Sequence, residues 1–148
     1  MKQASRVMFI LLAACAWAQA PSESSESLPA RATLEQLMLD LIYPASNDLL
    51  LTIFRGGPKD EGEWAAARRS ALALAESGNL LLTRSRSPQA DWMKDTKLLV
   101  DAGAAAYKAA QARDTKALAD VREPLDRSCT TCHRQFRPNV FPQQGGSK

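Results

Sequence analysis

The stretch Cys129-Thr130-Thr131-Cys132-His133 is the feature that most constrains this chain. It sets two thiols and an imidazole at positions i, i+3 and i+4. On a helix, side chains with this spacing project from one face, about one turn apart. The rest of the chain must therefore fold so that this one helix face, with both sulfurs and the ring, borders a site.

Covalent haem attachment needs this set of side chains. The two thiols add across the vinyl groups of the porphyrin, and the neighbouring imidazole binds the iron from the proximal side. Cys-x-x-Cys-His is the signature of c-type haem, and His133 is the only histidine of the chain. The motif predicts one covalent haem c, with Cys129 and Cys132 as its thioethers and His133 as the proximal iron ligand.

Three other interpretations of the motif are weaker. A thioredoxin-like redox pair expects a strand-helix-strand context, which the sequence does not indicate. A structural zinc site needs a fourth ligand, and the mature chain has no further cysteine or histidine to supply one. In an ordinary exported disulfide, a histidine directly after Cys132 would be a coincidence.

The first twenty residues have the features of an export signal. Lys2 and Arg6 give a short positive start, residues 7–14 are apolar, and residues 18–20 form a small-x-small cleavage site. The apolar run is too short to span a bilayer as a helix. We therefore expect residues 1–20 to be a signal peptide and the mature domain to lie in the periplasm.

Cys15 offers an alternative end to this signal. Residues 12–15 resemble the bacterial lipoprotein box, in which the cysteine is lipidated and becomes the new N-terminus. Residues 21–31 would then be a disordered linker that tethers the domain to a membrane. Otherwise Cys15 belongs to an apolar run that is removed after Ala20, and we favour this soluble product.

Charge gives no indication of nucleic-acid binding. Residues 1–20 carry two positive and no acidic side chains, so their removal lowers the net charge from +3 to +1. No basic cluster with interleaved aromatic residues remains, and we expect no nucleic-acid partner.

The sequence after the linker is typical of helices, since alanine and leucine abound while valine and isoleucine are scarce. A capping box at Thr33 opens the first helix, Pro44 predicts a kink within it, and Gly56-Gly57-Pro58 predicts its end. Its apolar stripe at helical spacing is Leu34, Leu37, Met38, Leu41, Ala45, Leu49 and Ile53.

Three more amphipathic segments follow. The second begins near residues 60–63, with an apolar stripe of small residues that permits close approach of a neighbouring helix. The third begins at Ser87-Pro88. The fourth is capped by Asp114, is kinked or restarted near Pro124, and carries both haem cysteines on its inward stripe. These segments predict an all-α, antiparallel up-down-up-down four-helix bundle over residues 32–138, followed by a flexible tail at 139–148.

With its haem motif on the last helix, the chain resembles the class II c-type cytochromes, the cytochrome c′-like four-helix bundles. The residues from His133 to Arg137 fit the family's ending, in which Cys-x-x-Cys-His is followed by x-x-aromatic-Arg. The resemblance covers about residues 32–138. It implies that Phe136 and Arg137 lie beside the haem.

In this family the first helix supplies the distal side of the iron. Low-spin members use a methionine there, whereas five-coordinate members block the iron with an apolar residue. The resemblance implies Met38 as the distal ligand, although a methionine on an apolar stripe is commonly core filler. A register shifted by one turn would bring Leu34 or Leu41 to the iron instead. Met93 is a weaker candidate and is expected in the core.

Other side chains have two interpretations each. Arg137 either pairs with a haem propionate or interacts with the helix end as a solvated charge. Arg31 either reaches the other propionate or is a free surface residue. Phe136 packs against the porphyrin edge or the bundle core, and Trp64 and Trp92 are expected core anchors.

These features predict a periplasmic one-electron carrier between redox partner proteins, and no enzyme, since no spare histidine remains to act as a general base. The alternative is a five-coordinate, cytochrome c′-like protein that binds small gases such as NO or CO. Family relatives often pair through their first two helices, so the resemblance allows a homodimer. A membrane partner is expected only if Cys15 is lipidated.

Overall fold

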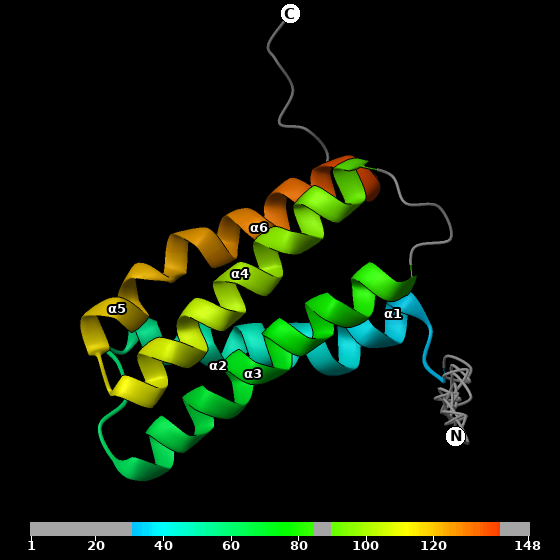
Figure 1. The fold of residues 1–148 in the computed structure, drawn as a ribbon. Coiled ribbons are helices and arrows are strands. Elements are labelled where there is room, and N and C mark those ends of the chain that lie inside the picture. Colours follow the sequence, from blue (N-terminus) through cyan, green and yellow to red (C-terminus); the bar gives the residue numbers. More distant parts are fainter. Residues whose placement is uncertain (1–30, 85–89, 140–148) are drawn as a thin grey trace, which may run out of the picture.

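The computed structural model describes residues 31–84 and 90–139 (Figure 1). These residues are helical apart from short connections, and they contain no strand. The predicted signal peptide, Cys15 and the Ser87-Pro88 helix start lie outside the described residues, as do nearly all of the predicted linker and tail.

The described chain forms four helical segments, as the sequence predicts. The first joins α1 (Leu34–Gln36), the π-helix η1 (Leu37–Ile42) and α2 (Tyr43–Phe54) without a break. The second is α3 (Glu61–Arg84) and the third is α4 (Ala90–Ala112). The fourth is divided into α5 (Thr115–Asp120) and α6 (Arg122–Phe136).

The helix caps predicted at Thr33, Asp114 and Gly56-Gly57 are confirmed. Thr33 Oγ1 accepts a hydrogen bond from the Gln36 amide at 3.1 Å, and the Gln36 side chain accepts one from the Thr33 amide at 2.8 Å. Together they satisfy two donors that a helix start otherwise leaves unpaired. Asp114 caps α5 with one hydrogen bond, which its carboxylate accepts from the Ala117 amide at 2.9 Å. Gly56 and Gly57 end α2 with φ angles of 85° and 87°, which glycine adopts without strain.

Helices α3 and α4 make the most extensive contact among the described helices. An added Cβ on Gly103 of α4 would lie 2.5 Å from the Ala75 amide nitrogen and 3.1 Å from the Ala71 carbonyl oxygen of α3. The predicted stripe of small residues on α3 is buried here, together with Trp64, Leu74 and Leu81. Small side chains therefore let the two backbones touch.

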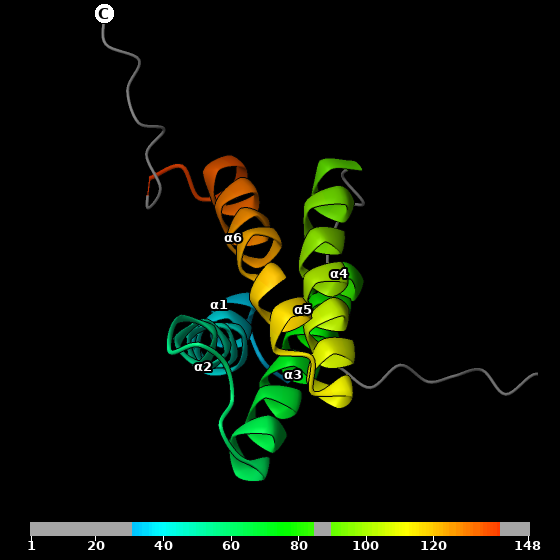
Figure 2. The ribbon, with the colours of Figure 1, turned by 90° about the vertical axis from the view of Figure 1, so that its left-hand side faces the viewer.

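The other helices pack around this pair. The first helix packs on α3, and α6 packs on α4, whereas α2 and α6 make little contact (Figure 2). The Trp92 indole donates to the Leu81 carbonyl at 3.1 Å and joins the start of α4 to α3. The side-chain Nε2 of Gln135 donates to the Asp91 carboxylate at 3.0 Å and joins the end of α6 to the start of α4.

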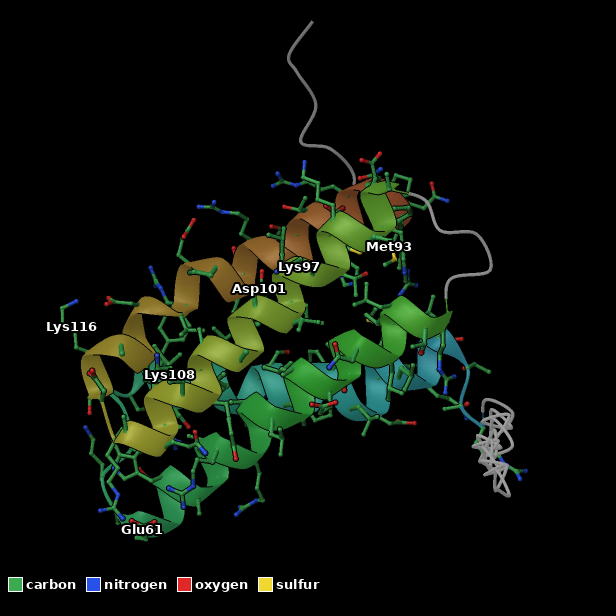
Figure 3. All side chains as sticks on the ribbon, viewed as in Figure 1. Glu61, Met93, Lys97, Asp101, Lys108 and Lys116 are labelled. Atoms are coloured by element: carbon green, nitrogen blue, oxygen red, sulfur yellow. The ribbon has the colours of Figure 1, made fainter. Side chains whose placement is uncertain are left out.

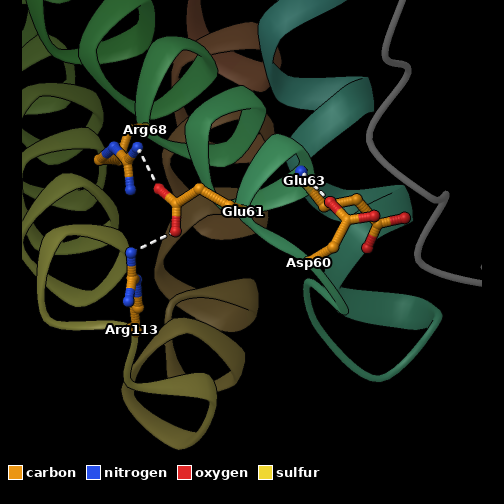
Figure 4. Close-up of polar contacts among 5 residues, drawn as sticks. All are labelled: Asp60, Glu61, Glu63, Arg68 and Arg113. Atoms are coloured by element: carbon orange, nitrogen blue, oxygen red, sulfur yellow. Dashed lines mark hydrogen bonds and ion pairs between the residues drawn. The ribbon is translucent and has the colours of Figure 1, made fainter.

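Ion pairs and hydrogen bonds also join other helix ends. Glu61, at the start of α3, pairs with Arg68 of the same helix at 3.1 Å and with Arg113 after the end of α4 (Figure 4). Arg84, at the end of α3, donates to the Ala32 carbonyl just before α1. These contacts tie segments that are distant in sequence.

The predicted core stripe of the first helix is partly wrong. Leu34 and Leu41 are 45% and 42% exposed, and Ile42 is buried in place of Leu41. The reason is η1, whose wider turn takes one residue more than an α-helical turn and so rotates the side chains before it. Pro44 follows this turn directly, and the predicted irregularity near it takes the form of a π turn.

The predicted restart near Pro124 is observed at Val121, between α5 and α6. Pro124 has no amide hydrogen for the Asp120 carbonyl, and in an unbroken helix its ring would crowd that carbonyl. The break at Val121 removes this conflict. Leu118 before the break and Leu125 after it are both buried, so the inward stripe continues across the break.

The first helix, from Leu34 to Phe54, is long and apolar enough to cross a membrane by length and composition. Core helices of soluble proteins meet the same criterion, and here Leu37, Ile42 and Leu49 are buried in the core shared with α3. The criterion therefore does not by itself indicate a membrane span.

We expect Gly103→Ala to lower the free energy of unfolding by about 1–3 kcal/mol, because the added methyl meets backbone atoms of α3 that cannot rotate away. Ala104→Leu, at an exposed position of the same helix, adds more volume but should change stability by less than about 0.5 kcal/mol. Urea unfolding monitored by circular dichroism compares the two. A Gly103→Ala variant as stable as the Ala104→Leu control would contradict the close contact.

Candidate functional site

The motif Cys129 to His133 lies within α6, in the helical conformation that its spacing predicts. Cys132 is buried, and Cys129 and His133 are half-buried. The two cysteines are free thiols. Because α6 continues through the motif to Phe136, both thiols and the imidazole point from the inward side of one helix.

Two adjoining hollows border the motif. The inner one, of about 30 Å³, lies between α6, α4, α3 and η1. The outer one is an open groove of about 350 Å³ between the start of the first helix, the start of α4 and the end of α6. Met38, Cys132 and His133 line both hollows. Residues far apart in the sequence thus surround one continuous site.

The walls of the site are mainly apolar. Ile42, Leu81 and Leu99 line the inner hollow. Trp92 and Phe136 line the outer groove and contact each other edge to face, with ring centroids 5.1 Å apart and planes at 78°. This geometry is favourable for aromatic pairs, and it fixes the end of α6 against α4.

Burial makes both thiols weak acids. It raises the pKa of Cys129, and it raises the pKa of Cys132 to about 11, with the nearby charge of Asp95 as a further cause. Catalytic Cys-x-x-Cys pairs have lowered pKa values, because the thiolate is their reactive form. This environment and the absence of strands in residues 31–84 and 90–139 both disfavour a thioredoxin-like pair.

The imidazole of His133 is neutral at pH 7. Burial lowers its pKa, and the positive charge of Arg137 one turn later lowers it further. A neutral imidazole can offer a nitrogen lone pair to a metal, whereas an imidazolium cannot. The environment of His133 is therefore suited to metal ligation.

Two neighbouring polar residues of α4, Asp95 and Thr96, are buried, and the sequence does not predict the burial of Asp95. Asp95 is only 4% exposed, and both side chains line the inner hollow. The Asp95 Oδ2 and Thr96 Oγ1 atoms have no hydrogen-bond partner within the described structure. Burial raises the pKa of Asp95, and the negative charge of Asp91 raises it further, against an opposing effect of Lys94.

Of the other predicted site residues, some line the outer groove and some border neither hollow. Phe136 and Arg137 line the outer groove with Leu34. Arg31 is exposed and borders neither hollow. Met93 borders neither hollow and is 39% exposed on α4 (Figure 3), so its predicted core position is wrong.

The residues of this site fit a haem c. Two thiols one turn apart match two vinyl groups, the neutral imidazole can bind iron, and Arg137 at the groove rim suits a propionate. The inner hollow has room for a water molecule or two, while the outer groove has the size of a small-molecule pocket.

No protein family model, curated protein or solved structure matches this chain. Within residues 31–84 and 90–139, no three histidine, cysteine, aspartate or glutamate side chains converge to hold a metal ion by themselves. That finding concerns ions held by side chains alone, and iron in a porphyrin is a different case.

We expect Asp95→Asn to raise the free energy of unfolding at pH 7 by about 1 kcal/mol, because it removes the charge of a buried carboxyl whose Oδ2 atom has no hydrogen-bond partner. A carboxyl pKa raised in the folded state favours folding at low pH, and this contribution is lost as pH rises through the folded pKa. The advantage of Asn should therefore shrink toward pH 4, near the ordinary aspartate pKa of 3.8.

Thermal unfolding of the full chain at several pH values measures this difference. Asp101→Asn, at an exposed position of the same helix, is the matched control and should change stability by less than about 0.5 kcal/mol. An Asp95→Asn effect that is equal at pH 4 and pH 7 would contradict the buried-charge explanation.

Proposed function

We propose that this chain is an exported c-type cytochrome of the class II type, which carries single electrons between partner proteins through one covalent haem. The observation that carries the proposal is the grouping of Met38 of η1 with Cys132 and His133 of α6 around both hollows. Cys129 joins them in the wall of the inner hollow. The family resemblance of the last helix agrees with it.

We propose the antiparallel up-down-up-down order for the bundle. Contacts between helix ends support it, since Arg84 at the end of α3 reaches Ala32 before α1, and Arg113 after α4 reaches Glu61 at the start of α3. Gln135 near the end of α6 reaches Asp91 near the start of α4. In this order the end of the fourth helical segment meets the start of the first.

Each residue of the site has a role in this proposal. Cys129 and Cys132 would hold the haem covalently, and His133 and Met38 would bind its iron. A bound haem supplies a one-electron iron couple, and a soft thioether ligand favours the ferrous state. Arg137 would pair with a propionate at the groove rim.

The protein around the site limits the reorganisation that accompanies electron transfer. Trp92 and Phe136 fix the end of α6, and the close α3–α4 contact fixes the walls of the inner hollow. The outer groove opens at the end of the bundle, where a partner protein can come close. We propose a periplasmic location from the signal sequence, with membrane attachment only if Cys15 is lipidated.

Covalent haem attachment is tested on protein matured in a periplasm with a haem-attachment system. We expect a pyridine haemochrome assay to find one haem per chain that survives acid-acetone extraction. Cys132→Ser should lose this covalent haem partly or wholly, because the thioether needs sulfur. Thr131→Ser, at an exposed position inside the motif, should keep it. Colourless wild-type protein with Cys129 and Cys132 joined in a disulfide would refute the proposal.

Met38 ligation is tested by the visible and near-infrared spectrum of the oxidised protein. We expect a methionine-to-iron charge-transfer band at the red end of the visible spectrum, which is lost in Met38→Leu. Met93→Leu should keep the band, because Met93 borders neither hollow. A wild-type high-spin spectrum that Met38→Leu leaves unchanged would exclude Met38 and favour the gas-binding alternative.

A further inference from the structure

We propose that the π turn η1 is the device that aims Met38 at the haem site, and that Pro44 is its positioning residue. Without this turn, Leu39 would point where Met38 now points. The inference rests on the proposed function, and it explains why the side chain of Met38 faces the site. It is carried by the backbone bonding, the burial pattern and the positions of the two hollows.

The first step is the backbone. The Tyr43 amide donates to the Met38 carbonyl, five residues earlier, whereas an α-helix bonds to the carbonyl four residues earlier. The buried residues Leu37 and Ile42 are also five apart. In an uninterrupted α-helix they would be separated by about 140° around the axis. The π turn brings both of them to the core.

The second step is the direction of Met38. In an uninterrupted α-helix, Met38 would lie seven residues before Ala45 and within about 20° of its direction, toward the core. Since the π turn absorbs one residue, Met38 lies as if six residues before Ala45, rotated by roughly 100°. That is close to the direction of Leu50, which lines a small pocket with Arg122 of α6.

The third step compares Met38 with its neighbour. Leu39 is 59% exposed and lines neither hollow, while Met38 lines both of them beside His133. In a regular α-helix without the extra residue, Leu39 lies six residues before Ala45 and its side chain faces α6. A regular helix would therefore present an apolar leucine to the iron in place of a thioether.

The fourth step is the cause of the turn. In a regular helix Pro44 could not donate to the Asp40 carbonyl, and its ring would crowd that carbonyl. The wide turn lies immediately before Pro44, where it relieves this conflict. π turns within α-helices frequently occur at functional sites.

The test exchanges the two side chains. The double variant Met38→Leu/Leu39→Met keeps the composition of the helix, and we expect it to bind covalent haem but to lose the methionine-to-iron band. A second variant deletes the exposed Leu41 and carries Pro44→Ala, which removes the extra residue and permits a regular α-helix with Met38 still facing α6. This variant should keep the band.

Retention of the band by the double variant, or its loss in the deletion variant with covalent haem still bound, would overturn the inference. A haem-independent readout is the NMR correlation through the hydrogen bond from the Tyr43 amide to the Met38 carbonyl. Its presence in the wild type is expected, and its absence also overturns the inference. Wild-type protein that shows this correlation but no methionine-to-iron band would refute the Met38 ligand of the proposed function and leave the π turn standing.

Discussion

The close contact of α3 with α4 is the interaction on which the rest of the structure depends. At Gly103 the two backbones approach so closely that an added Cβ would meet the Ala75 amide. Every other helical segment packs on one of these two helices: the first on α3, and α5 and α6 on α4. Because Leu81 of α3 and Leu99 of α4 wall the inner hollow, the spacing of this pair also sets the width of the site.

Burial then determines the chemistry of the last helix. It keeps the thiols of Cys129 and Cys132 protonated and the imidazole of His133 neutral. Neutral groups can be buried without a charged partner, which explains how three chemically active side chains share one inward helix face. The same burial disfavours the charged form of Asp95, so the ionised carboxylate destabilises the fold beside the site.

The sequence was sufficient to predict the helical class, the described capping residues and the helical conformation of the Cys-x-x-Cys-His motif, because each depends on local spacing. It was not sufficient for the register of the first helix. Periodicity assumes 3.6 residues per turn, and the π turn before Pro44 violates that assumption, so the pattern wrongly places Leu34 and Leu41 in the core. The burial of Asp95 departs from a different rule, because a charged residue on an amphipathic helix normally faces the solvent.

Both of these departures occur around the same hollow. The π turn carries Met38 into its wall, and α4 contributes Asp95 and Thr96 to it. A chain selected only for stability would avoid an interrupted helix and a buried carboxyl with an unsatisfied oxygen, since each has a cost in free energy. Their coincidence beside His133, at residues outside the Cys-x-x-Cys-His motif, is therefore an argument for a functional site there that is independent of the motif itself.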